Sequence, residues 1–303
     1  MSLALLFPGQ GAQHPQMLRW LTAQPDAHPA LDAMAGALGS GWQHRFHDPT
    51  WLHANPVAQV LLTGLGIAAW RALAPHLPPP AVIAGYSVGE LAAFAAADVF
   101  DLPTALELAS ARARLMSDSV AGQDTGLLAV QGPHAQLVAE TSQALSVAIR
   151  INQERVIVGG LVAALNACSA QWSAAGLRCT HLPIAVASHT PFMASAAAAF
   201  AQRLTAVDLQ PARTAVVCNF SASADRRPTK LAAALAGQIA CTIRWDDCMD
   251  VIAERRVKCV LEVGPGTALA SMWRERHPSI PVRSVDEFDT MVGVVRWTLA
   301  QLG

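Results

Sequence analysis

A single hydroxyl stands at the centre of a glycine-flanked segment, Gly85-Tyr86-Ser87-Val88-Gly89. The residues before it, 81–85, predict a short buried strand, and the alanine-rich residues after it predict a helix from about Val88. G-x-S-x-G between a strand and a helix is typical of a nucleophile elbow, a sharp turn that exposes the serine Oγ. The N–H groups at the start of the helix would stabilise an oxyanion. The pattern favours Ser87 as a nucleophile, and the alternative is a serine that merely caps a glycine-rich turn.

A serine nucleophile needs a general base, and ten histidines compete for that role. His181 lies inside an expected strand, and eight others lie in polar or irregular stretches. His189, in the segment 186–193 (VASHTPFM), comes just before an expected helix, where the chain leaves a small domain. Active-site residues favour such junctions. We therefore expect His189 to be the base, and the alternative is an exposed loop histidine.

Two further glycine-rich loops follow expected strands, at residues 7–11 (FPGQG) and 262–266 (EVGPG). Open α/β sheets bind ligands at the carboxyl ends of their parallel strands, so the three loops would meet at one edge. Gln10 could donate a hydrogen bond to an oxyanion there, or it could be a surface loop glutamine. The loops thus predict one site assembled from distant parts of the chain.

The elements that must position these loops alternate along most of the chain. Helices are expected from Asn55, from Asp101 to about Ser119, over 190–204 and at the end of the chain, between strands at 3–7, 81–85, 214–220, 258–263 and 280–285. This alternation predicts an α/β fold with a mostly parallel sheet covered on both faces. Residues 125–184 instead show the order β-α-β-β-α-β, the ferredoxin-like pattern. We expect a core of residues 1–123 and 188–303, with residues 124–187 inserted as a small domain.

Composition excludes several classes of protein. The chain has 303 residues, 52% of them hydrophobic, and a net charge of −1, which argues against disorder and against a nucleic-acid-binding surface. The six cysteines form no CxxC pair, so we expect reduced thiols in a cytoplasmic protein rather than a zinc site or disulfides. The first residues lack the basic region of a signal peptide, and we expect no apolar stretch of transmembrane length and no membrane partner.

Five motifs together resemble one known family. They are FPGQGAQ (7–13), GYSVGE (85–90), an arginine 25 residues after the serine, SHTPFM (188–193) and EVGPG (262–266). In this order and spacing, from residue 3 to about residue 270, the chain resembles the malonyl-CoA:acyl-carrier-protein transacylases, including the acyltransferase domains of fatty acid and polyketide synthases. The resemblance implies an α/β-hydrolase-like core with a ferredoxin-like insert, malonyl-CoA and an acyl carrier protein as partners, and no metal or redox cofactor.

The resemblance also implies roles for individual residues. Ser87 would be the nucleophile and His189 its base, with Gln10 and the backbone N–H of Val88 forming the oxyanion hole. Arg112 would bind the free carboxylate of the malonyl group. A planar guanidinium pairs with a carboxylate through two parallel hydrogen bonds, which suits that role. A solvated helix arginine is the alternative, and Arg114 should face elsewhere on the helix.

Three positions match the family less simply. Asn152 corresponds to a family asparagine near the site, although one residue is missing just after it. Tyr86 stands where most relatives have histidine; the sequence assigns it no role, and the simplest alternative is that it packs beside the elbow. Relatives usually have a glutamine whose backbone carbonyl orients the histidine; counting back from 262–266 puts Arg255 there. A carbonyl is available from any residue, so Arg255 is expected to keep that role.

The GYSVGE segment and the compact, alanine-rich chain look most like the epsilon subunit of malonate decarboxylase, which loads the carrier subunit of that enzyme. A general fatty-acid or polyketide malonyl transacylase is the first alternative. A serine thioesterase or hydrolase is the second, and it would usually orient its histidine with a carboxylate, for which Asp246 or Asp247 is conceivable. A non-catalytic carrier-binding subunit is the third. It would tolerate loss of Ser87 or His189, and both are present.

Overall fold

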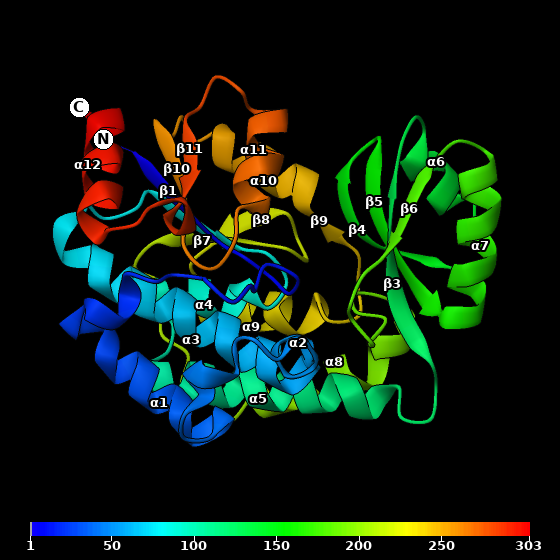
Figure 1. Ribbon diagram of the computed structural model, residues 1–303, viewed down its shortest axis with the longest axis horizontal. Helices are drawn as coiled ribbons and strands as arrows, with labels where there is room; N and C mark the ends of the chain where they lie inside the picture. Colours follow the sequence, from blue (N-terminus) through cyan, green and yellow to red (C-terminus); the bar gives the residue numbers. More distant parts are fainter. Residues whose placement is uncertain (1) are drawn as a thin grey trace.

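The larger of two sheets in the computed structural model, which describes residues 2–303, is almost entirely parallel (Figure 1). Its strand order is β11-β10-β1-β2-β7-β8, and only the β7–β8 pair is antiparallel. The strands are β1 Leu3–Phe7, β2 Val82–Gly85, β7 Ala215–Cys218, β8 Ser223–Asp225, β10 Cys259–Glu262 and β11 Val282–Ser284. Neighbours that are distant in sequence, such as β1 and β10, bring the carboxyl ends of separate segments to one edge.

Helices cover both faces of this sheet, as the sequence predicts. The α-helices around it are α1 His28–Leu38, α2 Pro49–His53, α3 Asn55–Leu73, α4 Gly89–Ala96, α5 Leu102–Ser119, α8 Ala194–Leu204, α9 Pro228–Gly237, α10 Trp245–Ala253, α11 Ala268–Arg276 and α12 Met291–Leu302. Short 3-10 helices lie at Leu21–Ala23, Pro25–Ala27, Trp42–Arg45, Ala74–His76, Pro191–Met193 and Val285–Glu287.

Strand β1 shows how the sheet divides the core. Leu3, Leu5 and Phe7 join a cluster with side chains of α3, α4, α5, α8 and α9. Ala4 and Leu6 join a second cluster with side chains of α10 and α11. Successive side chains of a strand point to opposite faces, so an uninterrupted apolar strand is stable only where both faces are covered.

Helix α3 corrects one expectation from the sequence. Together with the following 3-10 turn it spans Asn55–His76, which is long and apolar enough to cross a membrane by length and composition. However, 78% of its most apolar window is buried inside the protein. Helix α3 packs against α1, α4 and α5, so its apolar surface is used as the core of this fold.

The smaller sheet is mainly antiparallel, with the order β6-β3-β5-β4-β9. Its strands are β3 Thr125–Gln131, β4 Ser146–Asn152, β5 Arg155–Leu161, β6 Arg178–His181 and β9 Ile243–Arg244, and its helices are α6 Ala135–Glu140 and α7 Val162–Ala174. The β-α-β-β-α-β order of residues 125–181 is the one predicted from the sequence. Helices α6 and α7 lie on the outer face of this sheet (Figure 1), where Ala139 and Trp172 pack on Val130 and Val158.

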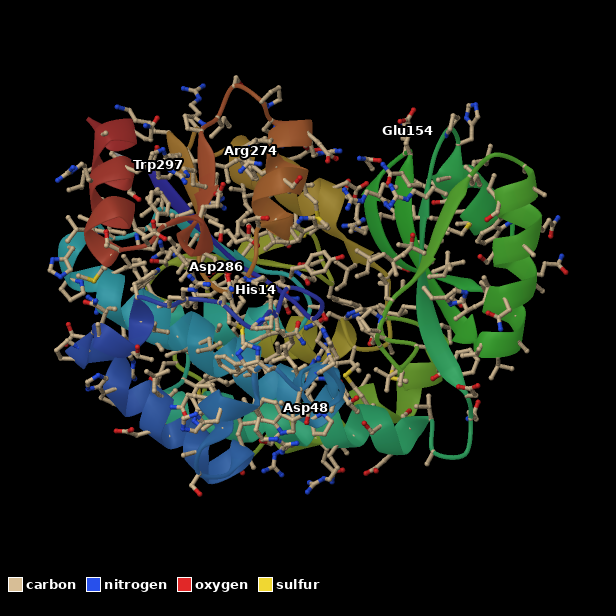
Figure 2. All side chains as sticks on the ribbon, in the orientation of Figure 1. His14, Asp48, Glu154, Arg274, Asp286 and Trp297 are labelled. Carbon is tan, nitrogen blue, oxygen red and sulfur yellow. The ribbon has the colours of Figure 1, made fainter. Side chains whose placement is uncertain are left out.

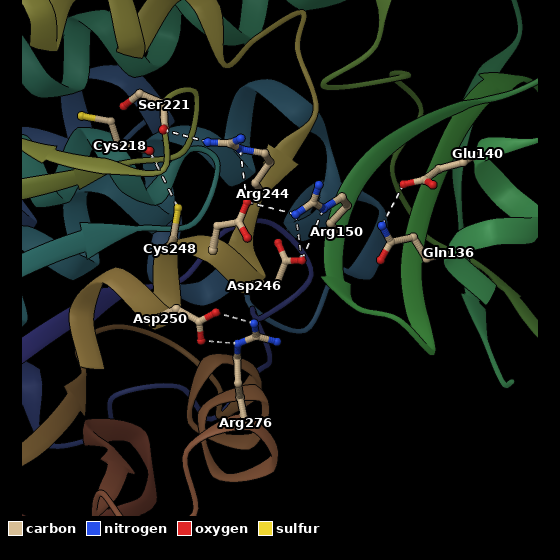
Figure 3. Close-up of polar contacts among 11 residues, drawn as sticks. Gln136, Glu140, Arg150, Cys218, Ser221, Arg244, Asp246, Cys248, Asp250 and Arg276 are labelled. Atoms are coloured by element: carbon tan, nitrogen blue, oxygen red, sulfur yellow. Dashed lines mark hydrogen bonds and ion pairs between the residues drawn. The ribbon is translucent and has the colours of Figure 1, made fainter. Parts of the chain in front are cut away.

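A contact that the sequence does not predict joins the two sheets. Strand β9, which leads directly into α10, pairs in parallel with β4 of the smaller sheet. Next to it, Arg150 of β4 forms ion pairs with Asp246 at 3.1 Å and Asp247 at 3.0 Å, both on α10 (Figure 3). The two carboxylates and the strand pairing therefore hold the smaller sheet against the larger one.

Candidate active site

Ser87 occupies the tight turn between β2 and α4. Its φ of 55° lies in the left-handed region, which a residue with a side chain adopts only where its surroundings hold it. Asn219 supplies that support: its Oδ1 accepts from the Ser87 N–H at 2.8 Å, and its Nδ2 donates to the Gly85 carbonyl at 2.6 Å. The elbow expected from the sequence is therefore present, and a side chain from the end of β7 braces it.

Both flanking glycines are required by close backbone approach. A Cβ added at Gly85 would lie 2.1 Å from the carbonyl carbon of Gly89, and one added at Gly89 would lie 2.2 Å from the Phe7 carbonyl oxygen. These contacts are with backbone, which cannot move aside as a flexible side chain would. The strand and the helix can thus meet at this sharp turn only if both positions lack a side chain.

We expect Gly85→Ala to lower the free energy of unfolding by roughly 3 kcal/mol or more, because the methyl group forces strand and helix apart. Thermal or urea unfolding monitored by circular dichroism measures the effect. Gly36→Ala in α1 is the matched control, since a Cβ there meets no atom within 4 Å. That control should stabilise the protein by about 0.5–1 kcal/mol. Equal stabilities for the two variants would contradict the steric argument.

His189 lies directly against Ser87, as the sequence predicts. The Ser87 hydroxyl and His189 Nε2 are 2.7 Å apart. The other ring nitrogen, Nδ1, is 2.5 Å from the Gln238 carbonyl oxygen, which can only accept, so Nδ1 carries the proton. In the neutral ring Nε2 is then the free acceptor, oriented to take the Ser87 proton.

The acceptor at Nδ1 corrects the assignment of Arg255. Arg255 lies beyond the end of α10, is exposed, and donates its N–H to the Ile252 carbonyl. Gln238, just after α9, supplies the carbonyl instead, and its side-chain Nε2 donates to the Ser87 carbonyl at 3.1 Å. Counting back from 262–266 reached a residue that follows α10, whereas the carbonyl comes from a residue that precedes this helix. A buried glutamine ending an alanine-rich helix was the available signal.

Burial sets the protonation state of His189. It lowers the pKa of His189 to about 3, with the positive charge of Arg112 acting in the same direction and the bond to Gln238 opposing both. The ring is therefore neutral, and able to act as a base, far below the ordinary histidine pKa.

We expect the rate of Ser87 acylation to stay level from neutral pH down to about pH 5, because His189 does not take up a proton in that range. Single-turnover acylation followed by intact mass measures this rate, with circular dichroism at each pH as the control for folding. An acid limb near pH 6.5, with the fold intact, would show that the histidine titrates as in water.

Arg112 lies on α5 with 0% of its surface exposed. Its Nη1 donates to Gln59 Oε1 at 2.8 Å, and its Nη2 lies 3.4 Å from Ser87 Oγ. No carboxylate of residues 2–303 lies within ion-pair distance of it. Burial lowers the pKa of Arg112 to about 10, so the guanidinium still carries its charge at neutral pH. Arg114, by contrast, is exposed, as expected from its place on the helix.

Gln59 is a site residue that the sequence analysis missed. It is fully buried on α3, and while its Oε1 accepts from Arg112 its Nε2 donates to Asn55 Oδ1 at 2.8 Å. A lone amide within the apolar run of that helix was a signal that could have been followed. Its effect is to orient the guanidinium toward Ser87 without neutralising it.

The loop that carries Gln10 lies against the elbow. A Cβ at Gly9 would lie 2.7 Å from the Tyr86 carbonyl oxygen, which shows how close the two segments run. Within residues 2–303, neither the Gln10 nor the Val88 backbone N–H donates a hydrogen bond. Two unpaired donors on adjacent turns are what a developing oxyanion requires.

A buried carboxylate fastens this loop from the other side. Asp286 accepts from His14 Nε2 at 2.5 Å and from the backbone N–H groups of Leu18 and Gly266. His14 and Asp286 lie side by side near the middle of the view in Figure 2, with the His14 side chain partly exposed and the Asp286 carboxylate beneath it. Asp286 thus ties the loop after β1 to the loop after β10, two of the three glycine-rich loops picked out in the sequence.

A cavity of about 290 Å³ opens beside Ser87 and His189. Gln10 and Tyr86 line it, and most of its wall is apolar and comes from both sheets and α11, including Leu127, Ile149, Ile157, Leu269 and Met272. Tyr86 packs edge-on against Trp245, with ring centroids 5.1 Å apart, which agrees with the packing alternative. The largely apolar wall offers few polar groups that could hold water beside Ser87 and His189.

Asn152 does not lie at this cavity, which corrects its assignment. It ends β4, where its Oδ1 accepts from the Glu154 N–H at 2.9 Å, and it lines a separate hollow with Arg150 and Arg276. Its side chain accepts a hydrogen bond within the turn of the β4–β5 hairpin, so its role is to stabilise that turn. The asparagine at the nucleophile is Asn219, which directly follows the strand expected at 214–220.

The described residues therefore bring together a serine hydroxyl, a neutral histidine, two unpaired backbone donors and a buried cation that has no ion-pair partner. This set can form an acyl-serine and stabilise the oxyanion of its formation. The carboxylates of Asp246 and Asp247 take no part, because both pair with Arg150.

Comparison with known proteins agrees with this chemistry. The sequence profile of the acyl transferase domain matches residues 4–293. A malonyl CoA-acyl carrier protein transacylase of Haemophilus influenzae is 28% identical, over 94% of this chain and 95% of its own. The crystal structure of an acyl-carrier-protein S-malonyltransferase from Burkholderia pseudomallei superposes with a TM-score of 0.90, at 25% identity, over 98% of this chain and 100% of that one. The crystal structure of an acyl carrier protein S-malonyltransferase from Vibrio cholerae superposes with a TM-score of 0.88, at 26% identity. The match covers 97% of this chain and 100% of that one. This chain belongs to the acyl transferase family.

Proposed function

We propose that this enzyme moves a malonyl group from malonyl-CoA to the thiol of an acyl carrier protein. The observation that carries the proposal is the position of Arg112, a buried cation without a carboxylate partner, 3.4 Å from Ser87 Oγ. An acyl group that ends in a free carboxylate would supply the missing anion. The names of the similar proteins point to the same substrate and the same class of acceptor.

The reaction would run through a malonyl-serine. His189 Nε2 takes the Ser87 proton while Oγ attacks the thioester carbon, and the N–H groups of Gln10 and Val88 bind the resulting oxyanion. The carbon–sulfur bond then breaks, and CoA leaves with the proton from His189. The carrier thiol next gives its proton to His189 and attacks the malonyl-serine, and Ser87 recovers that proton when its ester bond breaks.

We propose further that the physiological acceptor is the carrier subunit of malonate decarboxylase. The support is the GYSVGE segment, with Tyr86 in place of the usual histidine, and the compact alanine-rich chain. Carriers of fatty-acid or polyketide synthesis fit the relatives equally well. Hydrolysis is less well supported, since His189 is oriented by a backbone carbonyl and the cavity beside it is largely apolar.

The architecture is proposed as an α/β-hydrolase-like core of residues 1–123 and 188–303 with a ferredoxin-like small domain at residues 124–187. Support for the small domain comes from its β-α-β-β-α-β order and its antiparallel strand arrangement β6-β3-β5-β4. Strand β9 belongs to the core by sequence but pairs with β4 in the sheet of the small domain. The two units therefore share a sheet and are not independent of each other.

The decisive experiment offers purified protein malonyl-CoA and two carriers, one from fatty acid synthesis and one bearing the dephospho-CoA-derived arm. Intact mass follows malonyl transfer to each carrier. Selective loading of the second carrier supports the malonate decarboxylase assignment, and preference for the first moves the enzyme to general synthesis. Release of free malonate with neither carrier loaded would overturn the transferase proposal in favour of a hydrolase.

A further inference from the structure

Glu90 is a buried acid next to the nucleophile that the reaction above does not use. It lies on the first turn of α4, three residues after Ser87, with 0% of its surface exposed. Its Oε1 accepts from the Asn219 N–H at 2.5 Å. Its Oε2 is buried and has no hydrogen-bond partner in the described part of the chain. One donor for two carboxyl oxygens is poor compensation for a buried negative charge.

Glu262 shows how this protein solvates a buried carboxylate. It is also 0% exposed, but its two oxygens accept separately from the N–H groups of Leu269 at 3.2 Å and Ala270 at 2.8 Å, at the start of α11. Burial raises the pKa of Glu90 and of Glu262 alike, to about 8. The two residues differ instead in the number of hydrogen-bond donors around the carboxyl group: Glu262 has two and Glu90 has one. Fewer donors stabilise a negative charge less, so the surroundings of Glu90 suit an uncharged acid.

The charged and titratable groups around Glu90 do not offer it an ion pair. Arg112 on α5 is the nearby cation, but no contact within 4.0 Å joins the two side chains, and the guanidinium is directed to Gln59 and Ser87. Cys218 on β7 and Cys248 on α10 also face Glu90, and burial raises the pKa of both thiols, so they are neutral. An anion at Glu90 would chiefly offset the charge of Arg112.

Glu90 is also connected to both halves of the catalytic pair. Asn219 donates its backbone N–H to Glu90 Oε1, and the Oδ1 of the same asparagine accepts from the Ser87 N–H. The Gln238 side chain lies near the Glu90 carboxyl and lowers its pKa, though by less than burial raises it, and Gln238 Oε1 is a second buried oxygen without a hydrogen-bond partner. A hydroxyl at Glu90 would supply a donor to a network that lacks one.

We propose that Glu90 is protonated in the working enzyme, where it positions Asn219 and Gln238 and leaves the charge of Arg112 to the free carboxylate of the acyl group. The first function concerns the structure alone. The second rests on the malonyl transfer proposed above. Glu90 is thus a positioning residue, and its neutrality contributes to the preference for an anionic acyl group.

Infrared spectroscopy tests the protonation directly and without any substrate. The difference spectrum of the wild type minus Glu90→Gln, taken at pH 7, should contain the carbonyl stretch of a protonated carboxylic acid. Raising the pH through about 8 should convert it to carboxylate bands. A difference spectrum that shows only carboxylate bands at pH 7 would overturn the proposal, whatever reaction the enzyme catalyses.

Kinetics test the consequence for the acyl group. Glu90→Gln is neutral and nearly isosteric, so it should keep kcat/KM for malonyl-CoA and the preference over acetyl-CoA within about threefold, whereas Glu90→Leu should lower kcat at least about tenfold with little change in KM. In the wild type the preference should fall above about pH 8, and in Glu90→Gln it should not. A rise of tenfold or more in the malonyl preference of Glu90→Gln would show that an anion had been removed, and would overturn the proposal. Failure of the wild type to transfer malonyl would refute the proposed function and leave the infrared result standing.

Discussion

Ser87→Ala should abolish the malonyl-enzyme adduct and lower kcat/KM for malonyl transfer by about 10⁴–10⁶-fold. The variant keeps His189 and the donors of Gln10 and Val88, but it has no atom that can form the ester. Transfer would then require a direct attack of the carrier thiol on malonyl-CoA, for which the cavity is not arranged. Intact mass after mixing with malonyl-CoA measures the adduct, and the loading of the carrier measures turnover.

Ser188→Ala is the matched control for that variant. Ser188 lines the same cavity and is also buried, yet its hydroxyl makes only a long contact of 3.5 Å to the Val186 carbonyl. It should form the malonyl adduct within about threefold of the wild-type rate, since it touches no reacting atom. An adduct of the same mass in Ser87→Ala would place the nucleophile elsewhere and refute the assignment.

Arg112→Ala should lower kcat/KM for malonyl-CoA by about 10- to 100-fold or more and leave acetyl-CoA nearly unaffected, so that the preference between them disappears. A charge-assisted pair with a carboxylate in a buried site contributes about 1.5–3 kcal/mol or more, and the uncharged acetyl group does not use it. Parallel measurement of both thioesters separates this effect from a general loss of activity. The unfolding midpoint must be recorded as well, because the change leaves Gln59 Oε1 without its donor.

The control for Arg112 lies two residues along the same helix. Arg114 is exposed, so Arg114→Ala removes an equal charge from α5 without touching the site. Both thioesters should react with that variant as with the wild type. If Arg112→Ala were to slow malonyl and acetyl transfer equally, the guanidinium would be holding the elbow rather than reading the acyl group.

The residues named from the sequence that the structure brings together share one property. Each was recognised from a side chain or a glycine-rich loop that the sequence itself shows, and Ser87 Oγ contacts both His189 and Arg112. Ser87 and Gln10 directly follow parallel strands that the apolar runs predict, but the order of those strands is known only from the structure. The element order of residues 125–181 was predictable, since it depends on local periodicity.

The two misplaced residues show the opposite case. Arg255 was assigned a role that any backbone carbonyl can perform, and the structure gives that role to Gln238. Asn152 was assigned by position in a motif, but its side chain closes a hairpin. The bracing of the elbow by Asn219 and the orientation of Arg112 by Gln59 likewise join segments far apart in the chain, which no local pattern records.

By itself, then, the sequence identified the side chains that the structure brings together at one site: the hydroxyl of Ser87, the imidazole of His189 and the guanidinium of Arg112. It also determined the alternating elements, because the periodicity of buried residues is a local property of the chain. Only the tertiary structure decided which carbonyl holds His189, which amides brace Ser87 and Arg112, and that Glu90 has a single donor. Those features depend on backbone groups and on distances between remote segments, and a backbone carbonyl or an empty hydrogen-bonding position has no residue type by which a sequence could reveal it.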